Sequence, residues 1–313
     1  MADDVEWTLD GITFNVGPDE NGVEWAVEYE RGWSGGATPR SARSVRVSGH
    51  GSYRGPAYRA ERLVELTCWA HAPTREARRR AEHRLAALCS DPGRLYPLLC
   101  LEETGPLTAY VELDDELDPI ISRDGRWLDF VIALAAPDPR KYGPWTSAEA
   151  EPPSDPPGGV DATTAGGVDA TTAGGVDAGG GGSTGRLSIT NAGTALVGPL
   201  FELVGPLPAN TELADTTTGE TLRYTAAIAA GQLVVINADE HPVEYGGVIY
   251  PARSVLLTNP ANPADVADRG AFLGLVGDWP TIQPGQTGTW AFRPPSGASP
   301  AARARIHLRP ANW

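Results

Sequence analysis

The first 145 residues contain several short runs in which apolar and polar positions alternate, the pattern of half-buried β-strands. The run from Val5 to Val16 has Asp10-Gly11 at its centre, a pair that readily adopts the positive φ angles of a tight hairpin turn. Other alternating runs predict strands at residues 23–29, 44–47, 62–69, 108–113 and 127–134. We therefore expect this part of the chain to form a mostly antiparallel sheet.

One segment has helical periodicity instead. Thr74 can cap a helix whose apolar positions recur every three to four residues and which ends at Asp91-Pro92-Gly93; these positions are Ala77, Ala81, Leu85 and Leu88. The opposite face carries Arg75, Arg78, Arg79, Arg80 and Arg84. Such faces are usually solvated, and docking onto an acidic neighbour is the alternative.

Residues 185–313 show no helical periodicity. Short strands are predicted at residues 187–190, 200–204, 221–224, 233–236, 248–250, 254–257, 289–292 and 305–308, separated by turn signals such as Thr218-Gly219 and Pro284-Gly285. This spacing predicts a β-sandwich or jelly roll.

Residues 146–184 separate these two domains. They include the octet GGVDATTA from Gly158 to Ala165, a second copy from Gly166 to Ala173 and a partial third copy from Gly174. The composition has no core-forming residues, so the segment is predicted to be a linker or an extended arm. The repeat lacks the Gly-x-Asp step of calcium-binding nonapeptides, which argues against a calcium site.

The charge balance restricts the function. The chain of 313 residues carries 25 basic and 40 acidic side chains, a formal charge of −15, which disfavours nucleic-acid recognition as its main task. The longest apolar stretch, Trp127 to Ala136, is about half of the roughly 20 residues that span a bilayer. The acidic start precedes no apolar signal core, so we expect folding in the cytosol.

The residues capable of chemistry form no site in the sequence. Cys68, Cys89 and Cys100 lack metal or disulfide spacing and are expected to be buried thiols. Ser34 lies in a Gly-x-Ser-x-Gly match, but no helix follows it as a hydrolase requires, so a glycine-rich loop with an exposed Trp33 is predicted.

Metal and cofactor motifs are likewise missing from the sequence. The five histidines lie far apart, at positions 50, 71, 83, 241 and 307. The acidic run Asp114, Asp115, Glu116 and Asp118 lacks the ligand spacing of a calcium loop and is interpreted as an exposed strand end. No phosphate-binding glycine motif is present, so neither a cofactor nor an enzymatic activity is predicted.

Aromatic side chains leave one binding alternative, because ring faces can stack on sugars. Trp279 precedes Pro280 in a loop and Trp313 is the last residue of the sequence, so both are candidates for contact with a glycan or a partner. Trp290 alternates within a strand and is assigned to the core.

The order of these features resembles the distal tail protein (Dit) family of long-tailed, siphovirus-type bacteriophages, especially versions from actinobacterial phages. The resemblance rests on residues 51–70, GSYRGPAYRAERLVELTCWA, the helix that follows, and Asp138-Pro139-Arg140 at the end of the first domain. It also rests on residues 189–207, ITNAGTALVGPLFELVGPL, and residues 216–237, TTTGETLRYTAAIAAGQLVVIN, in the second. Relative to the family, residues 259–270 look like an inserted loop.

The resemblance implies a structural virion protein of the tail tip. Six copies would form a hub ring through residues 1–145, through which DNA only passes, and residues 185–313 would form a galectin-like or jelly-roll sandwich facing outward. Implied partners are the tail tube protein, the hub or tip protein, and fibre or receptor-binding proteins, with synthesis in the bacterial cytoplasm and no membrane insertion. Arg75, Arg78 and Arg79 are then candidates for the oligomer or tube interface. The alternatives are a carbohydrate-binding β-sandwich module and a hydrolase using Ser34.

Overall fold

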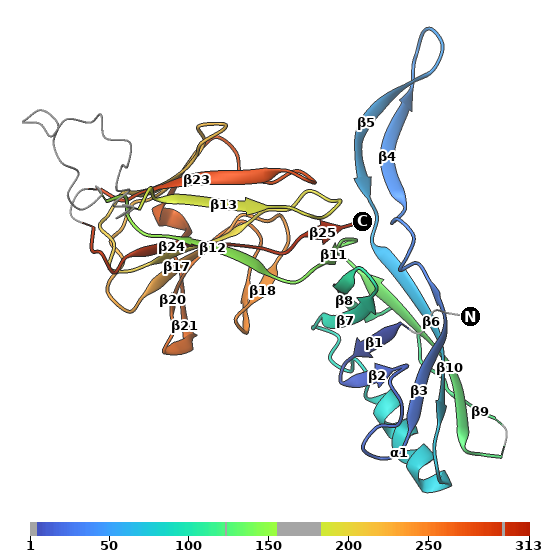
Figure 1. Ribbon diagram of the computed structural model, residues 1–313. Helices are drawn as coiled ribbons and strands as arrows, with labels where there is room; N and C mark the ends of the chain where they lie inside the picture. Colours follow the sequence, from blue (N-terminus) through green and yellow to red (C-terminus); the bar gives the residue numbers. More distant parts are fainter. Residues whose placement is uncertain (1–4, 123, 155–182, 296–297) are drawn as a thin grey trace, which may run out of the picture. The chain divides into compact units, whose positions relative to one another are not determined.

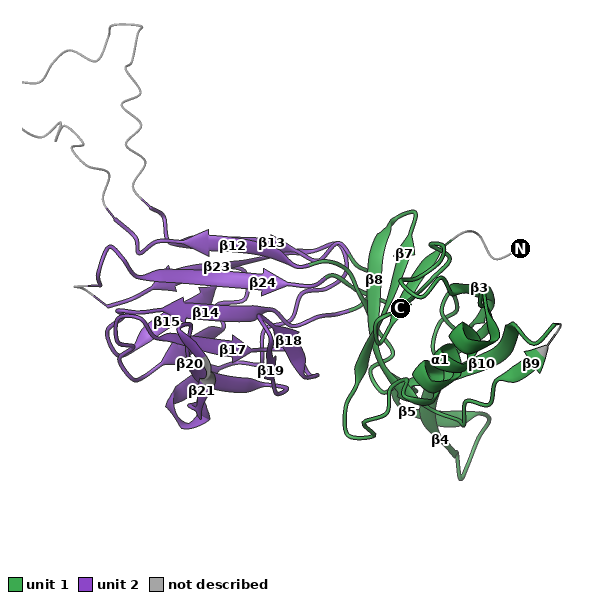
Figure 2. Cartoon of the chain, turned by 90° about the horizontal axis from the view of Figure 1, so that it is seen from below, with its two compact units in different colours: residues 1–144, 193–195, 310–313 green, residues 145–192, 196–309 purple. Residues whose placement is uncertain are grey.

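The computed structural model describes residues 5–122, 124–154, 183–295 and 298–313 (Figure 1). The chain forms two compact units (Figure 2). Unit 1 comprises residues 1–144, 193–195 and 310–313, and unit 2 comprises residues 145–192 and 196–309. The octet repeats at residues 158–178 lie outside the described residues.

Unit 1 is built on a ten-stranded antiparallel sheet with the main order β2-β1-β7-β8-β10-β6-β3. The main strands are β1 (Glu6–Leu9), β2 (Ile12–Phe14), β3 (Glu24–Arg31), β6 (Arg62–His71), β7 (Tyr96–Glu102), β8 (Gly105–Leu113) and β10 (Trp127–Ala136). Three short strands join it: β9 (Ile120–Ser122) pairs with β10, β11 (Lys141–Tyr142) pairs with β8, and β25 (Ala311–Asn312) pairs with β11. The predicted antiparallel, strand-rich first domain is confirmed.

Local sequence signals account for the hairpin and the helix of unit 1. In the β1–β2 turn Asp10 has φ 45° and Gly11 φ 77°, and the turn brings Leu9 opposite Ile12. The helix α1 (Arg75–Ala86) begins where predicted, and the side chain of Thr74 accepts a hydrogen bond of 3.1 Å from the Ala77 amide. The buried apolar face of α1 packs into the core of unit 1.

A two-stranded ribbon extends from unit 1. It consists of β4 (Pro39–Val45) and β5 (Ser52–Arg59), which pair only with each other (Figure 1). The residues of the ribbon are exposed, apart from Ser41 and Gly55, which are half-buried. An isolated two-stranded hairpin is at best marginally stable in water. The ribbon therefore depends on its attachment to unit 1, and on any partner surface that covers it, to stay ordered.

The base of the ribbon is held by one buried arginine. The Arg62 guanidinium, 1% exposed, donates hydrogen bonds to the carbonyl oxygens of Gly32 at 2.8 Å, Trp33 at 3.0 Å, Gly35 at 2.6 Å and Pro139 at 2.9 Å. Burial is the main cause that lowers the pKa of Arg62, so these carbonyl oxygens are what solvate the charge. A side chain at Gly32 (φ +90°) would place its Cβ 1.9 Å from the Leu63 carbonyl oxygen, which explains the glycine there.

Unit 2 is a β-sandwich. Its six-stranded sheet has the order β12-β24-β14-β17-β20-β21 and contains β12 (Thr146–Ala150), β14 (Leu200–Val204), β17 (Leu233–Asn237), β20 (Ser254–Asn259), β21 (Asn262–Asp268) and β24 (Arg303–Leu308). Its five-stranded sheet has the order β13-β23-β15-β16-β22 and contains β13 (Arg186–Thr190), β15 (Thr211–Asp215), β16 (Thr221–Tyr224), β22 (Leu273–Val276) and β23 (Thr287–Arg293). A small hairpin, β18 (Val243–Tyr245) and β19 (Val248–Tyr250), and one 3₁₀ turn (Gly270–Phe272) complete it.

The core of the sandwich contains the aromatic residue assigned to it from the sequence. Trp290 on β23 is 1% exposed and makes an edge-to-face contact with Phe201 on β14, with ring centroids 5.1 Å apart. Since these strands belong to different sheets, the pair fastens one sheet to the other. The mainly β fold with one α-helix is therefore confirmed.

Two strands of unit 2 contradict the predicted boundaries. The strand β12 lies within residues 146–184, which were assigned to a linker, and β21 lies within residues 259–270, which were assigned to an inserted loop. Both are the outermost strands of the six-stranded sheet. An edge strand needs a backbone partner on only one side and can be largely polar, so it shows little apolar alternation in sequence.

Two expectations about burial can also be compared with the structure. Cys68, Cys89 and Cys100 are free and buried, as predicted, and burial is the main cause that raises the pKa of Cys89 and Cys100 to about 12. Trp33 was expected to be exposed but is 2% exposed. Its indole N–H donates a 2.7 Å hydrogen bond to Glu102 on β7, a long-range contact that turns the side chain inward.

The Arg62→Leu substitution is expected to lower the free energy of unfolding of unit 1 by about 3–5 kcal/mol, because four carbonyl oxygens lose their donor and two of these hydrogen bonds are buried. Hydrogen exchange of the β3 and β6 amides at increasing urea concentrations would measure the free energy of unfolding of unit 1 separately from that of unit 2. Arg79→Leu, at an exposed position of α1, is the control and should change the value by no more than about 0.5 kcal/mol. Equal stabilities for the two variants would contradict the role of Arg62.

Candidate functional site

The ribbon of unit 1 concentrates positive charge in an acidic protein. Residues 34–60 contain five arginines and no acidic residue, whereas the whole chain has a formal charge of −15. These arginines are Arg40, Arg43, Arg46, Arg54 and Arg59. Within the described part of the chain, only Arg59 makes a side-chain hydrogen bond, which it donates to the Ala37 carbonyl. The ribbon therefore offers a row of cations that the described residues of its own chain do not neutralise.

The register of the ribbon places two of these cations face to face. Arg43 on β4 is directly opposite Arg54 on β5. Like charges in directly opposed positions destabilise an antiparallel pair. Exposed apolar side chains accompany them, including Val45, 84% exposed, and Tyr53 and Tyr58, 62% and 63% exposed. This combination is typical of a surface that is covered by an acidic, partly apolar partner.

The arginines on α1 differ from one another in the structure. Arg75 and Arg79 are exposed, as expected for a solvent-facing helix surface, but Arg78 is buried at 8% exposure and forms an i,i+4 ion pair with Glu82. Arg84 is half-buried and lies 3.5 Å from the carboxylate of Asp19. The expectation that all five arginines share the exposed face is wrong for Arg78, because its stem packs on unit 1 and its charge is matched locally.

A pocket of about 490 Å³ lies in unit 1 next to Trp33. Glu30, Ser34, Glu102 and Lys141 line it. The Lys141 ammonium lies 3.7 Å from a Glu102 oxygen and 4.9 Å from the centre of the Trp33 ring, and burial is the main cause that lowers its pKa. Ser34 donates a 2.6 Å hydrogen bond to Glu30.

These contacts give Ser34 a structural role. A hydrolase with this motif would need a helix directly after Ser34, but the next element is the strand β4, and the Ser34 hydroxyl donates its hydrogen bond to Glu30 near the end of β3. The pocket residues instead fix the loop from which the ribbon starts. The interpretation of the Gly-x-Ser-x-Gly match as a glycine-rich loop is consistent with this arrangement.

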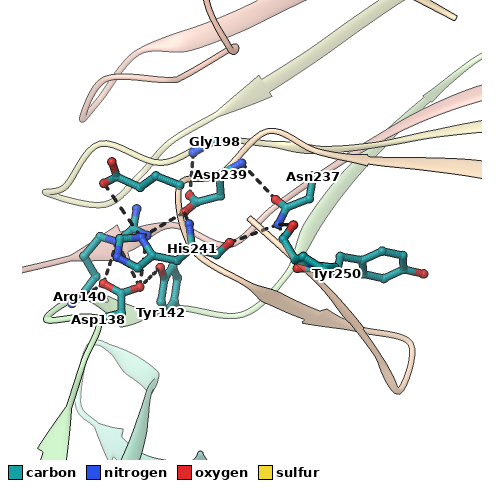
Figure 3. Close-up of polar contacts among 10 residues, drawn as sticks. Asp138, Arg140, Tyr142, Gly198, Asn237, Asp239, His241 and Tyr250 are labelled. Carbon is teal, nitrogen blue, oxygen red and sulfur yellow. Dashed lines mark hydrogen bonds and ion pairs between the residues drawn. The ribbon is translucent and has the colours of Figure 1, made fainter. Parts of the chain in front are cut away.

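The segment Asp138-Pro139-Arg140, quoted for the family resemblance, forms a compact polar cluster in unit 1 (Figure 3). The Arg140 guanidinium donates to both Asp138 oxygens, at 3.0 and 3.1 Å, and the Tyr142 hydroxyl donates to the same carboxylate. Since Pro139 also accepts from Arg62, this cluster and the base of the ribbon share one buried anchor.

A second polar network shapes a loop of unit 2 (Figure 3). The Asn237 amide donates to the carbonyl oxygens of His241, Tyr250 and Pro251, and the Asp239 carboxylate accepts from the amides of Gly198 and His241. Every one of these bonds satisfies a backbone group. The network therefore orders the loops of unit 2 around residues 198 and 237–251.

A serine, a histidine and a glutamate meet on the six-stranded sheet of unit 2. The Ser147 hydroxyl lies 2.7 Å from His307 Nδ1, and His307 Nε2 lies 3.2 Å from a Glu202 oxygen. The three residues come from β12, β24 and β14, neighbouring strands of one sheet, and the Tyr245 ring stacks on the imidazole with centroids 4.5 Å apart. We interpret the row as cross-strand pairing, because the three side chains come from adjacent strands and His307 is 3% exposed.

The charges in this row affect one another. Burial alone would raise the pKa of Glu202, but the hydrogen bond from His307 and the charges of His307 and Arg305 lower it on balance. Arg305 also pairs with the more exposed Glu149, at 2.5 Å. Unit 2 is thus stabilised by an ionised, largely buried Glu202.

The two tryptophans considered for glycan contact have different surroundings. Trp279 is half-buried and lines a pocket of about 490 Å³ in unit 2, together with Arg253, Ser254 and Asp268. Trp313 is 36% exposed and lies in unit 1, where the Arg59 guanidinium is 4.4 Å from its ring centre. The structure does not bring these two rings into one site, since each belongs to a different unit.

Among the residues that the structure describes, no three His, Cys, Asp or Glu side chains are grouped so that they could hold a metal ion. Nor does any helix there have the length and apolarity to cross a bilayer. The acidic residues Asp114, Asp115, Glu116 and Asp118 follow β8 and are exposed, as predicted for a strand end.

Comparison with solved structures identifies the fold. The Dit protein of phage SPP1, described as a paradigm of the hub adsorption apparatus in phages that infect Gram-positive bacteria, matches with a TM-score of 0.58 and 13% identity, over 97% of this chain and 98% of its own. The phage P2 baseplate in its activated conformation with Ca and with Sr gives TM-scores of 0.47 and 0.48 at 11% identity, again over 97% of this chain and over 97% and 98% of the matched chains.

These likenesses are structural. No family model matches the sequence, and no curated protein matches it. The fold is that of a phage tail hub protein, and more particularly that of Dit, over both units of the chain.

The Glu202→Gln substitution tests the buried charge of unit 2. Because the folded pKa of Glu202 lies below its ordinary value of 4.5, its contribution to stability is present above that value and is lost as the pH falls through the lowered pKa. We expect the variant to be about 1–3 kcal/mol less stable at pH 7, with the difference shrinking towards pH 3.

Thermal unfolding of the wild type and the variant between pH 7 and pH 3 would measure this difference. Glu149→Gln, whose side chain is 45% exposed, is the matched control and should cost less than about 1 kcal/mol. A difference between wild type and Glu202→Gln that stays constant over the whole pH range would refute the assignment.

Proposed function

We propose that this protein is a structural virion protein of a siphovirus-type phage tail tip, in which six copies form the hub ring. The observation that carries the proposal is the match to the SPP1 Dit fold over both units of the chain. Fold alone does not fix function, so the surfaces of this chain must also suit the task.

The surfaces of unit 1 suit a ring. A closed ring needs a heterologous interface, in which each copy presents two different surfaces. The arginine-rich ribbon is one exposed surface whose arginines have no carboxylate partner within the described chain. Arg75 and Arg79 on α1 are further exposed candidates, whereas the buried Arg78, paired with Glu82, is a weaker one. The net charge of −15 suits a conduit through which DNA passes without being held.

In this assignment unit 1 connects to the tail tube and unit 2 presents a sandwich to hub, tip, fibre or receptor-binding proteins. The protein would be made in the bacterial cytoplasm and would reside in the virion tail without inserting into a membrane. Its output would be shape and contact, without an enzymatic step or a cofactor. The cross-strand roles of Ser147, His307 and Glu202 support this view.

The mass of the purified full-length protein tests the ring. We expect multi-angle light scattering to give a mass near six times the 33.0 kDa of one chain. Because interfaces between copies obey mass action, the measurement should cover a wide range of protein concentrations. A mass of one chain at every concentration would contradict the proposal.

The pocket lined by Trp279 supports a second function, carbohydrate binding by unit 2. An indole face with a guanidinium and a carboxylate nearby is the combination that stacks on a sugar ring and bonds its hydroxyls. This function is compatible with a hub, since a tail-tip protein can also contact the host surface.

A glycan array tests this second function. Binding should be lost in Trp279→Ala and kept in Trp313→Ala, while circular dichroism shows both variants folded. No binding of the wild type to a broad array would remove the carbohydrate hypothesis and leave the hub unaffected.

A further inference from the structure

Unit 1 carries a second surface whose chemistry mirrors that of the ribbon. Five carboxylates lie between residues 112 and 118, at Glu112, Asp114, Asp115, Glu116 and Asp118. The strand that follows, β9, exposes Ile120 at 66% and Ile121 at 53%. We call residues 112–121 the acidic edge.

The acidic edge is held in place by its apolar residues. Leu113 and Leu117 are partly buried against the core of unit 1, and the Asp114 amide donates a 2.9 Å hydrogen bond to the Ala133 carbonyl. The carboxylates between these anchors are exposed. Within the described residues, none of them forms an ion pair, so their charge is available to a partner.

The ribbon and the acidic edge match in two respects. The ribbon provides cations that have no carboxylate partner in the described chain, at Arg40, Arg43, Arg46 and Arg54. Residues 112–118 provide carboxylates that form no ion pair there either. Exposed apolar side chains flank both sets, Val45 and Tyr53 on the ribbon and the two isoleucines on β9. Surfaces that pair in charge and in apolar area fit a protein partner.

The two surfaces lie apart within the unit. Figure 1 shows the ribbon projecting from one end of unit 1, whereas the acidic edge runs beside β10 in the body of the unit, from the end of β8 to β9. The outer part of the ribbon, with Arg43 and Arg54, therefore lies away from the acidic edge of its own copy. Two different complementary surfaces on one chain generate a heterologous, head-to-tail interface, which closes into a ring when the rotation allows.

We propose that the arginine-rich ribbon of one copy docks on the acidic edge of the next copy. This inference rests on the proposed ring and names the two surfaces that form it. The opposed Arg43 and Arg54, unfavourable in the free chain, are then separated by carboxylates of the neighbour. The apolar side chains at both surfaces are covered in the same step.

The alternative occupant of the ribbon is DNA. Arginines bind phosphates, but phosphates offer nothing to cover Val45, Tyr53 and Tyr58, and the rest of the chain is strongly acidic. The second copy is therefore the partner that the observations favour, and DNA binding becomes an outcome of the test.

Charge reversal tests the pairing in the full-length protein. The ribbon variant is R43E/R54E, the edge variant is D115R/E116R, and the swap variant carries all four substitutions. Each double variant should raise the concentration at which half of the chains assemble by about tenfold or more at 0.15 M salt, and the swap variant should restore assembly. R186E/R293E, with the same change in charge at exposed positions of unit 2, is the control and should assemble as the wild type does.

Mixing the two double variants gives the sharpest result. In an alternating ring every interface is complementary again, because the reversed ribbon meets the reversed edge and the native ribbon meets the native edge. An equimolar mixture should therefore assemble at wild-type concentrations although neither variant does so alone. Circular dichroism of each variant separates lost assembly from lost folding.

The outcomes distinguish the failure of the inference from the failure of the ring. A wild type that assembles together with double variants that assemble equally well would overturn this pairing and leave the ring standing. A wild type that is monomeric at all concentrations would overturn both. Binding of a fluorescent DNA duplex that is lost in R43E/R54E, with assembly unchanged, would assign the ribbon to DNA and overturn the pairing.

Discussion

The guanidinium of Arg62 is buried among four carbonyl oxygens, and the geometry of unit 1 depends on it. Three of those oxygens belong to the loop that leads into the ribbon and the fourth to Pro139, next to the cluster of Asp138, Arg140 and Tyr142. A buried charge is tolerated only where such acceptors are fixed, so Arg62 and the loop order each other. The ribbon thereby leaves the body of the unit from a rigid base.

A rigid base matters because the ribbon itself has few stabilising contacts. It is a two-stranded element with exposed apolar residues and opposed arginines, and it would be poorly ordered without a covering surface. The same chain carries a carboxylate-rich edge with exposed isoleucines. Segregation of opposite charges on one unit favours association between copies. In the proposed hub, unit 1 therefore mediates assembly and unit 2 presents the sandwich to partners.

Features encoded by neighbouring residues could be predicted from the sequence. Asp10-Gly11 indicated the first hairpin, Thr74 the start of the helix, and alternation around Trp290 its place in the core. Features that depend on distant partners could not. Trp33 is buried because Glu102, 69 positions away, accepts its indole N–H, and no local pattern signals that contact.

The polar edge strands β12 and β21 were missed for a related reason, since their order comes from pairing with β24 and β20. The charge of the ribbon could have been recognised from the sequence, because residues 34–60 combine five arginines with no acidic side chain.

The central claim is that the ribbon of one copy is ordered by the acidic edge of the next. Hydrogen exchange of the ribbon amides, measured over a range of protein concentrations, tests it most directly. If ribbon and acidic edge pair between copies, amide exchange at residues 39–59 and 112–122 slows together as the protein assembles, while exchange in the core of unit 2 stays unchanged. Fast exchange of the ribbon amides at every concentration, in a protein that does assemble, would contradict this pairing.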